Sequence, residues 1–279
     1  MQLYNDTTVK MSKLLTGAYS TSFSMGIKAF APKYREPIYA VYGFVRLADE
    51  IVDTFHGHDK KKLLTEFRAE TYKAIEARIS TNPVLHAFQL VVNKYGIDRS
   101  FIDAFLDSME MDLYNNYYKN KEYKDYIYGS AEVVGLMCLR VFVEGDRKLF
   151  DELYLPAKAL GSAFQKVNFL RDIKSDIEER GRIYLPGINE YVDINDVNKK
   201  LLEDGIREEF ELALEGIKRL PAGVRLGVYS AYLYYIKLFD KIRRSDVKVL
   251  MKKRVRVSNL RKLALLMKSV LEVKVLKTT

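Results

Sequence analysis

The sequence predicts an all-α protein, on three observations. Hydrophobic residues recur every three or four positions, for example within residues 39–55 and 201–217, and this is the spacing of one helix face. Strict alternation of apolar and polar residues, the pattern of a half-buried strand, is hard to find over six residues. The 6 Pro and 15 Gly are few for 279 residues, which argues against a fold of many short strands.

Proline and asparagine mark the first helix boundaries. Pro32 and Pro37 bracket the start of a helix that carries Asp49. Asn82 followed by Pro83 is the N-cap and N1 pair typical of a helix start. These residues separate helices in the first third of the chain.

The second half of the chain has similar markers. Pro156 is expected to open the helix that carries Asp172, and Gly181 is expected to end it. Pro186-Gly187 marks a loop, Leu220-Pro221 closes the next helix, and Ser258 suits the N-cap of the last. We expect about nine or ten helices in a single domain that spans residues 1–279, since linkers are short and no repeat divides the chain.

Composition excludes several classes of protein. The single cysteine, Cys138, rules out a disulfide framework and a multi-cysteine metal site, and its apolar neighbours suggest core packing. The N-terminus has no basic segment before an apolar one, as a signal peptide would. No uncharged apolar run reaches 18 residues, so no membrane span is expected. We therefore predict a cytoplasmic protein.

The positive charge lies mainly at the C-terminal end. The net charge is +9, and residues 237–279 contain fourteen Lys/Arg against three Asp/Glu, a net of +11. This region is a solvated basic surface, a site for anions or a surface attracted to acidic membranes. A nucleic-acid partner is not expected, because no zinc-finger spacing, Arg/Gly repeat or RNP-type strand is present.

Two acidic pairs of the same form carry the functional prediction. Asp49 and Asp53, and likewise Asp172 and Asp176, are four residues apart, so each pair lies on one helix face in adjacent turns. Each pair extends into a polar lane along its helix. The first lane comprises Tyr42, Arg46, Asp49 and Asp53, and the second comprises Gly161, Gln165, Asn168, Asp172 and Asp176.

A divalent cation would explain these polar lanes on otherwise apolar helices. Taking a carboxylate out of water costs several kcal/mol, and Mg²⁺ commonly binds one or two carboxylates together with substrate phosphates. Arg46 and Arg171 lie beside the acids and can pair with them or with phosphate oxygens. The alternative is that the acids are ordinary surface charges, which is common for one such pair and unusual for two. The spacing thus predicts a magnesium–diphosphate site.

Longer stretches around both pairs resemble the squalene/phytoene synthase family. Residues 168–186 contain N-F-L-R-D-I-K-S-D and then R-G-R-I-Y-L-P, similar to the family's second signature. Residues 42–53 resemble its first signature, a Tyr and an Arg before D-x-x-x-D. Shorter matches are S-T-S-F at 20–23, Y-I-Y at 126–128 and V-G-L at 134–136. The resemblance covers about residues 15 to 262.

This resemblance implies an isoprenoid synthase helical bundle with a central cavity. It implies a transferase that joins two identical allylic diphosphates head to head with Mg²⁺, or alternatively Mn²⁺. The metal ligands it implies are Asp49, Asp53, Asn168, Asp172 and Asp176. The implied substrate contacts are Ser20, Thr21, Ser22, Tyr42, Arg46, Gln165, Arg171, Tyr235 and Arg254. The implied catalytic set is Asp49, Asp53, Asp172, Asp176, Tyr128 and Arg171, with Tyr42, Tyr128 and Tyr235 lining the reacting region.

The predicted reaction is phytoene formation from two geranylgeranyl diphosphates, through a cyclopropyl (prephytoene) diphosphate. No G-x-G-x-x-G follows a strand, so no NADPH is expected, and this favours proton loss over reduction in the last step. Ile27, one turn after Phe23, is smaller than an aromatic residue and would leave room for the longer chain. Squalene or dehydrosqualene formation from farnesyl diphosphate remains the alternative.

Other classes fit less well. A non-catalytic assembly or scaffold relative would be expected to have lost the acids, and all four are present. A di-iron bundle needs Glu-x-x-His pairs, which none of the three His residues forms. Two departures from the family pattern leave details open: Glu132 stands where the family usually has Gly, and the match around Arg254 is looser.

The last helix has both apolar and basic residues. It could rest on a bilayer as a peripheral contact, or its apolar stripe could pack on the core. Oligomeric state, product stereochemistry and the number of metal ions stay open. The residues concerned are Leu263, Leu266, Met267 and Val270, with Lys262, Lys268 and Lys274.

Overall fold

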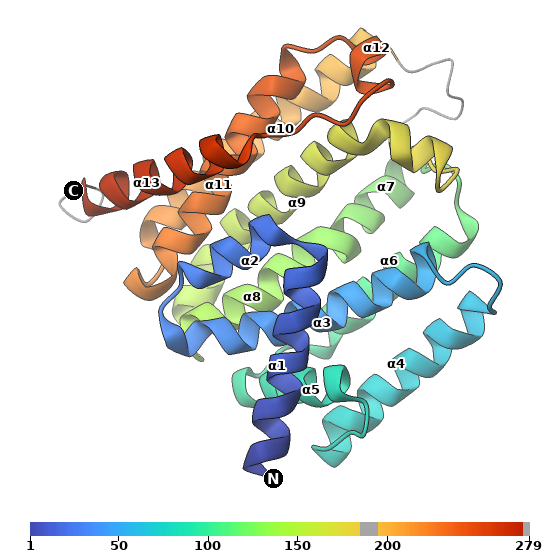
Figure 1. The fold of residues 1–279 in the computed structure, drawn as a ribbon, viewed down its shortest axis with the longest axis vertical. Helices are drawn as coiled ribbons and strands as arrows, with labels where there is room; N and C mark the ends of the chain where they lie inside the picture. The colour runs from blue at the N-terminus through green and yellow to red at the C-terminus, as the bar shows by residue number, and fades with distance from the viewer. Residues whose placement is uncertain (185–194, 276–279) are drawn as a thin grey trace.

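The structure, a computed structural model, describes residues 1–184 and 195–275, without the side chains of Thr21, Ser22, Asn120, Lys274 and Val275. Within these residues the chain forms thirteen α-helices, one π-helix and no β-strand, which confirms the all-α prediction (Figure 1). The helices are α1 (Gln2–Tyr19), α2 (Thr21–Lys28), α3 (Pro32–Asp53), α4 (Lys60–Ala77), α5 (Pro83–Tyr95), α6 (Arg99–Tyr114), α7 (Asn120–Ile127), η1 (Tyr128–Glu132), α8 (Val133–Val143), α9 (Arg147–Glu178), α10 (Asp196–Arg219), α11 (Ala222–Arg243), α12 (Val247–Leu250) and α13 (Asn259–Val275). The expected nine or ten was low because short helices such as α12 have too few residues to show a period.

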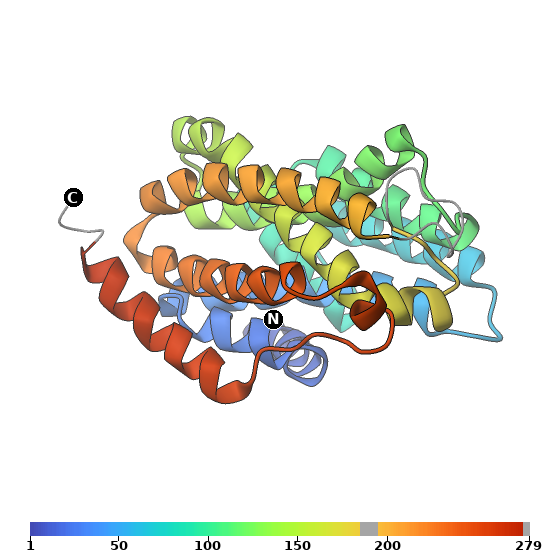
Figure 2. The same cartoon turned by 90° about the horizontal axis from the view of Figure 1, so that it is seen from above.

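The helices surround α9, the longest of them, which packs against η1, α8, α10 and α11. In Figure 1, α1, α2 and α13 lie toward the viewer. Figure 2 places these three helices along one side of the molecule and α10 along the opposite side. The two acidic pairs are on α3 and α9, in the C-terminal part of each helix.

Most of the predicted helix boundaries agree with the structure. Pro32 is the first residue of α3, and the Asn82 side chain caps α5 by accepting from the amides of Val84 and Leu85. Gly181 adopts a φ of +66° just after α9, a conformation that favours glycine. Pro186-Gly187 lies outside the described residues.

The predicted role of Pro156 is wrong. Helix α9 begins at Arg147, with Asp146 as its N-cap, and Pro156 lies inside it. An internal proline costs a backbone hydrogen bond, but here its ring packs closely on Gly216 of α10. A Cβ at Gly216 would lie 2.3 Å from the Cβ of Pro156, so the two helices touch at this point.

A cluster of phenylalanines fixes the helix that carries the first acidic pair. Phe44 of α3 is fully buried and stacks on Phe88 of α5, with their ring centres 3.9 Å apart. Phe67 of α4 and Phe105 of α6 also lie against Phe44, with centres 5.5 and 5.4 Å away. Burying four such rings stabilises the fold by several kcal/mol and sets the position of α3.

The stretch 121–143, from α7 through η1 to α8, is long and apolar enough to meet the composition criteria for a membrane span. More than half of its most apolar window, 56%, is buried inside the protein. Leu136 and Met137 are fully buried among neighbouring helices. The stretch therefore forms part of the protein core.

Glycines allow η1 to contact two neighbouring helices at backbone distance. A Cβ at Gly129 would lie 2.2 Å from the carbonyl oxygen of Ala104 in α6, and one at Gly161 of α9 would lie 2.6 Å from that of Ala131. We therefore expect Gly161→Ala to lower the free energy of unfolding by about 1–3 kcal/mol. Urea denaturation would measure the change. The matched control is Gly205→Ala, where a Cβ meets nothing within 4 Å and the substitution should be neutral or stabilising.

Candidate active site

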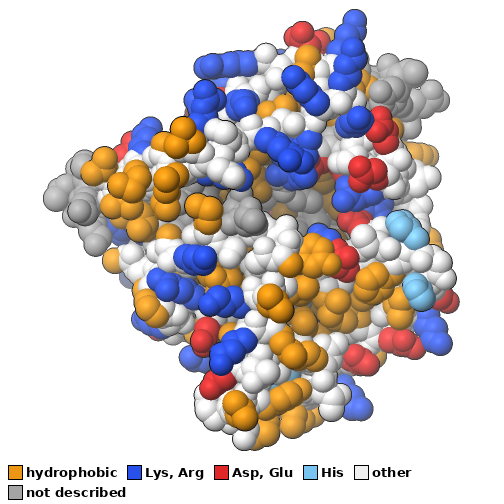
Figure 3. All heavy atoms as spheres, viewed as in Figure 1, with side chains coloured by type: hydrophobic (Ala, Val, Ile, Leu, Met, Phe, Trp, Pro, Cys, Tyr) orange, Lys and Arg blue, Asp and Glu red, His pale blue; other side chains and the backbone are white. Residues whose placement is uncertain are grey.

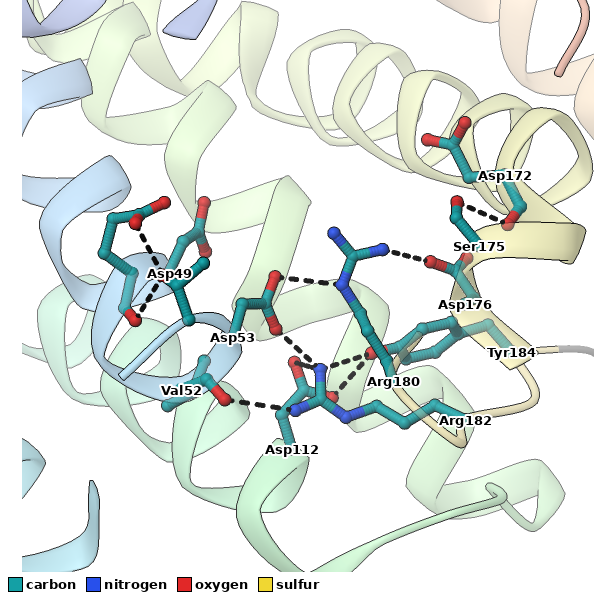
Figure 4. Close-up of polar contacts among 12 residues, drawn as sticks. Asp49, Val52, Asp53, Asp112, Asp172, Ser175, Asp176, Arg180, Arg182 and Tyr184 are labelled. Atoms are coloured by element: carbon teal, nitrogen blue, oxygen red, sulfur yellow. Dashed lines mark hydrogen bonds and ion pairs between the residues drawn. The ribbon is translucent and has the colours of Figure 1, made fainter. Parts of the chain in front are cut away.

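The two acidic pairs meet where α3 and α9 end. The guanidinium of Arg180 donates from Nε to Asp53 Oδ2 at 3.2 Å and from Nη1 to Asp176 Oδ1 at 2.7 Å (Figure 4). One side chain thus bridges acids that are more than a hundred residues apart in the sequence. The predicted convergence of the two motifs is what the structure shows.

The outer acids of the two pairs lie one helical turn away from this bridge. Asp172 accepts from Arg171 Nε at 2.9 Å and forms an ion pair with Arg254 Nε at 2.7 Å. Asp49 Oδ2 is 3.9 Å from Arg46 Nη1. The closer ion-pair partner of Arg46 is Glu50. Each predicted metal ligand of the aspartate type therefore has an arginine near it.

The carboxylates are not fully compensated by these arginines. Burial, followed by the charge of Asp172, raises the pKa of Asp176 to about 7. Burial is also the main cause that raises the pKa of Asp49 to about 7, with a smaller contribution from the charge of Asp53, although 32% of the Asp49 side-chain surface is exposed. Burial thus disfavours the ionised form of both carboxylates, and the neighbouring aspartate adds to this effect. A bound cation would stabilise the ionised form.

A buried network behind Asp53 was missed by the sequence analysis. Asp112 of α6 is 7% exposed, and it accepts hydrogen bonds from three tyrosine hydroxyls. The donors are Tyr118 at 2.6 Å, Tyr126 at 2.8 Å and Tyr184 at 2.8 Å. Asp112 is one of four acids on the amphipathic helix α6, with Asp103, Asp107 and Glu110, so no spacing pattern distinguishes it from a surface residue.

Arg182 connects this network to the first acidic pair. Its Nη1 donates to Asp53 Oδ1 at 2.8 Å and lies 3.5 Å from Asp112 Oδ2. Burial alone would lower the pKa of Arg182, but the nearby Asp112, Tyr184 and Asp53 raise it overall. Burial raises the pKa of Asp112, and Arg182 is the strongest opposing influence. Arg182 and Tyr184 both belong to the R-I-Y-L-P signature, and this signature is the sequence feature that could have identified them as site residues.

Several predicted substrate contacts lie around Asn168, one helical turn before Asp172 in α9. Tyr235 of α11 donates to Asn168 Oδ1 at 3.1 Å and stacks on Phe164, with ring centres 3.8 Å apart. Tyr42 stacks on Phe23, with ring centres 4.8 Å apart. Burial is the main cause that raises the pKa of Tyr42, and the nearby Tyr235 adds to this increase.

Two further predicted contacts adjoin these residues. Gln165 Oε1 is 3.5 Å from the Asn168 amide nitrogen, and the Ser20 side chain lies close to the Tyr42 hydroxyl. The side chains of Thr21 and Ser22 lie outside the described part of the structure. The substrate roles of all these residues remain predictions.

Tyr128 lies apart from this cluster. Lys158 Nζ lies over its ring at 5.0 Å and pairs with Glu132 at 3.0 Å, so the unusual Glu of the central helix has a basic partner. Tyr126 contacts the acids through Asp112. Two residues are about 200° apart around a helix, which is why Tyr126 and Tyr128 point to different sides. A role for Tyr128 in the reaction stays a prediction.

The space beside the acids is partly enclosed. A hollow of about 10 Å³, large enough for one water molecule, borders Asp176 and Arg182. Its remaining lining is Phe169, Ile173, Ile177, Ile183 and Tyr184. Figure 3 shows a recess in the middle of the face that carries α2 and α13, with Lys and Arg side chains along its upper edge.

The donor set suits a magnesium ion that is shared with a substrate. Among the described residues, no three Asp, Glu, His or Cys side chains converge on one point. Pairs of carboxylates, with the Asn168 amide oxygen nearby, would instead supply part of a coordination shell. Mg²⁺ commonly binds in this way, with one or two carboxylates and phosphate oxygens completing the octahedron.

Comparison with known proteins identifies the family and the fold. The squalene/phytoene synthase family model matches residues 16–261. The chain is 28% identical over 264 residues to a phytoene synthase of Arthrospira platensis, covering 86% of this chain and 85% of the relative. It is 30% identical over 266 residues to a 15-cis-phytoene synthase of Synechocystis sp., covering 86% and 78%. A crystal structure of a dehydrosqualene synthase in complex with ligand has the same fold, with a TM-score of 0.82 at 22% identity over 98% of both chains.

Proposed function

Because the chain belongs to the squalene/phytoene synthase family, we propose that it joins two geranylgeranyl diphosphates head to head and forms phytoene through a cyclopropyl diphosphate. The observation that carries the proposal is the Arg180 bridge between Asp53 and Asp176, which brings both signature motifs to one site. The names of the two cyanobacterial relatives support phytoene as the product.

The four aspartates and Asn168 would hold Mg²⁺, and Mn²⁺ could replace it. When bound, the metal would neutralise the negative charge of the diphosphate leaving group. This would make it easier for the allylic C–O bond to ionise. Arg171 and Arg254 now pair with Asp172. In the proposed complex these two side chains would exchange Asp172 for phosphate oxygens, to which a planar guanidinium can donate two hydrogen bonds.

The aromatic pairs beside Asn168 would protect the allylic cation. The stacked rings of Tyr235 with Phe164, and of Tyr42 with Phe23, offer π faces near the acids. Each such face stabilises a nearby cation by about 0.5–2 kcal/mol. These rings also keep water away from the cation, so that the second substrate's double bond reacts with it first.

In the proposed site, Arg180 occupies the position of a counter-ion between the two motifs and competes with a divalent cation. We expect Arg180→Gln to bind Mn²⁺ about tenfold more tightly at pH 8, because one positive charge next to the site is removed. Electron paramagnetic resonance of free Mn²⁺ would measure the affinity. Arg180→Lys keeps the charge and is the control that should resemble wild type. Equal or weaker Mn²⁺ binding by the Gln variant would contradict the competition.

The function is tested by identifying the hydrocarbon product. The protein is incubated with Mg²⁺ and either geranylgeranyl or farnesyl diphosphate, with and without NADPH. Phytoene from geranylgeranyl diphosphate without NADPH is the expected result. Dehydrosqualene, or squalene with NADPH, would assign the chain to farnesyl diphosphate. Loss of turnover when Mg²⁺ is removed by EDTA is expected, and no turnover of either substrate would contradict an enzymatic role.

The chain-length assignment depends on the neighbourhood of Ile27. The structure buries this residue within the core, at 1% exposure. An inward position is compatible with a wall of the substrate cavity, and the same position would suit a purely structural side chain. Geranylgeranyl diphosphate is therefore proposed on the names of the relatives, and the product test decides between the two substrates.

A further inference from the structure

Helix α13 has an apolar face on each side, and the described residues of the chain cover only one of them. On the inner side Ser269 and Val273 are buried, Ser269 Oγ is 2.7 Å from Ser230 Oγ of α11, and Tyr229 donates to Glu272 at 2.9 Å. The predicted stripe is therefore divided: Leu266 and Val270 are half-buried, whereas Leu263 and Met267 are exposed.

The outward side carries a continuous apolar stripe. At about 100° per residue its members fall within about 80° of arc, opposite Ser269. We call this set the α13 stripe: Leu260, Leu263, Met267 and Leu271, which are 79%, 51%, 59% and 64% exposed. Figure 3 shows hydrophobic side chains gathered where α13 lies, on the same face as the recess. An exposed patch of this kind indicates an interaction surface.

The surroundings of the stripe are strongly basic. Residues 247–275 contain nine Lys/Arg and a single acid, Glu272. Five exposed members of this group border or precede the stripe and are called the basic rim: Lys252, Lys253, Arg256, Arg261 and Lys268. Each basic residue near an anionic lipid surface contributes about 1 kcal/mol of attraction. Apolar side chains flanked by Lys and Arg are the pattern of an interfacial helix.

We infer that α13 and the basic rim dock this protein on an anionic membrane surface. The charge argues against a second copy of the chain as the occupant, because two basic rims would face each other and repel. Size argues the same way, since a stable dimer buries about 800 Å² on each partner and the stripe occupies one face of a 17-residue helix. A bilayer accepts the stripe in its headgroup region and attracts the rim.

The docking surface adjoins the active site. Arg254, which pairs with Asp172, belongs to the segment between α12 and α13 that also carries most of the basic rim. Docking would therefore place the mouth of the site near the lipid, where apolar chains partition. Docking of this kind requires only the α13 stripe and the basic rim, so vesicle binding can be measured without substrate.

The test is sedimentation with lipid vesicles that contain no prenyl compound. We expect wild type to bind phosphatidylcholine vesicles with 30% phosphatidylglycerol and to bind pure phosphatidylcholine at least tenfold more weakly. Leu263→Ser/Met267→Ser should lose roughly tenfold or more in affinity for the anionic vesicles. Lys252→Gln/Lys253→Gln should lose about as much, and added salt should weaken wild-type binding.

The matched control changes exposed apolar residues on the opposite side. Val197→Ser/Leu201→Ser alters α10 side chains that are 69% and 72% exposed, and its vesicle binding should stay within about twofold of wild type. The inference is overturned if wild type ignores anionic vesicles, if the stripe variant binds like wild type, or if charge makes no difference. A wild-type dimer that dissociates in the stripe variant, without vesicle binding, would assign the stripe to a second copy instead.

Discussion

Replacing Asp172 by Asn is expected to lower turnover by about a thousandfold or more while the protein stays folded. The substitution keeps the size of the side chain but removes the charge that, in the proposed site, holds both a metal ion and two arginines. Metal-dependent stabilisation of a leaving group is worth several kcal/mol, and about 4 kcal/mol corresponds to a thousandfold. Steady-state turnover of geranylgeranyl diphosphate with Mg²⁺ would measure the loss.

Glu178→Gln is the matched control for this prediction. Glu178 lies on the same helix, with its side chain 60% exposed and paired only loosely with Lys174 at 3.7 Å. Removing its charge should change turnover by less than about twofold, since surface pairs are worth little. Circular dichroism should show that both variants are folded. Wild-type turnover by the Asp172 variant would refute its role in metal binding.

Replacing Arg182 by Met is expected to produce the largest loss of stability. Arg182 is 7% exposed and is the guanidinium nearest the buried Asp112. Removing it leaves Asp112 buried with no compensating charge, which typically costs 3–5 kcal/mol. The midpoint of urea unfolding at pH 8 would fall accordingly. The loss should be smaller at low pH, because an unpaired buried Asp112 has a raised pKa and becomes neutral as the pH falls.

Two further variants distinguish a charge effect from a packing effect. Asp112→Asn/Arg182→Met removes both charges and should recover part of the lost stability. Arg180→Gln, at a side chain 32% exposed, should cost less than about 1.5 kcal/mol. Equal stability losses for Arg180→Gln and Arg182→Met would contradict the claim that Arg182 compensates the buried charge of Asp112.

The acidic motifs were predictable because their geometry is local. Asp49 and Asp53, or Asp172 and Asp176, share a helix face whatever the rest of the chain does, and the apolar surroundings implied that each face was partly buried. That the two faces meet was only an inference, and Arg180 is the contact that establishes it. Local periodicity contains no information on how two distant helices cross.

The missed residues act through long-range contacts. Asp112 meets Tyr118 nearby in the sequence, but it meets Arg182 and Tyr184 only after α6 and the end of α9 have packed together. Pro156 predicts a helix start because prolines are common in the first turn of helices. Its tolerance inside α9 depends on Gly216 of another helix, which no local pattern reveals.

The apolar pattern of α13 was only partly informative. It predicted an amphipathic last helix, but hydrophobic residues on two opposite faces look like one broad stripe in the sequence. The contacts of Ser269 and Glu272 with α11 decide which face is covered. Helix orientation thus had to come from tertiary packing rather than from the period.

The central claim is that the two acidic pairs act together on one diphosphate. Its most direct test is a crystal structure with Mn²⁺ and a non-reactive thio-diphosphate analogue of the substrate, recorded at the manganese absorption edge. We predict anomalous density within about 2.0–2.5 Å of carboxylate oxygens from both α3 and α9, with Arg180 displaced from between Asp53 and Asp176. Manganese bound away from these aspartates, or at only one of the two pairs with the diphosphate elsewhere, would contradict the claim.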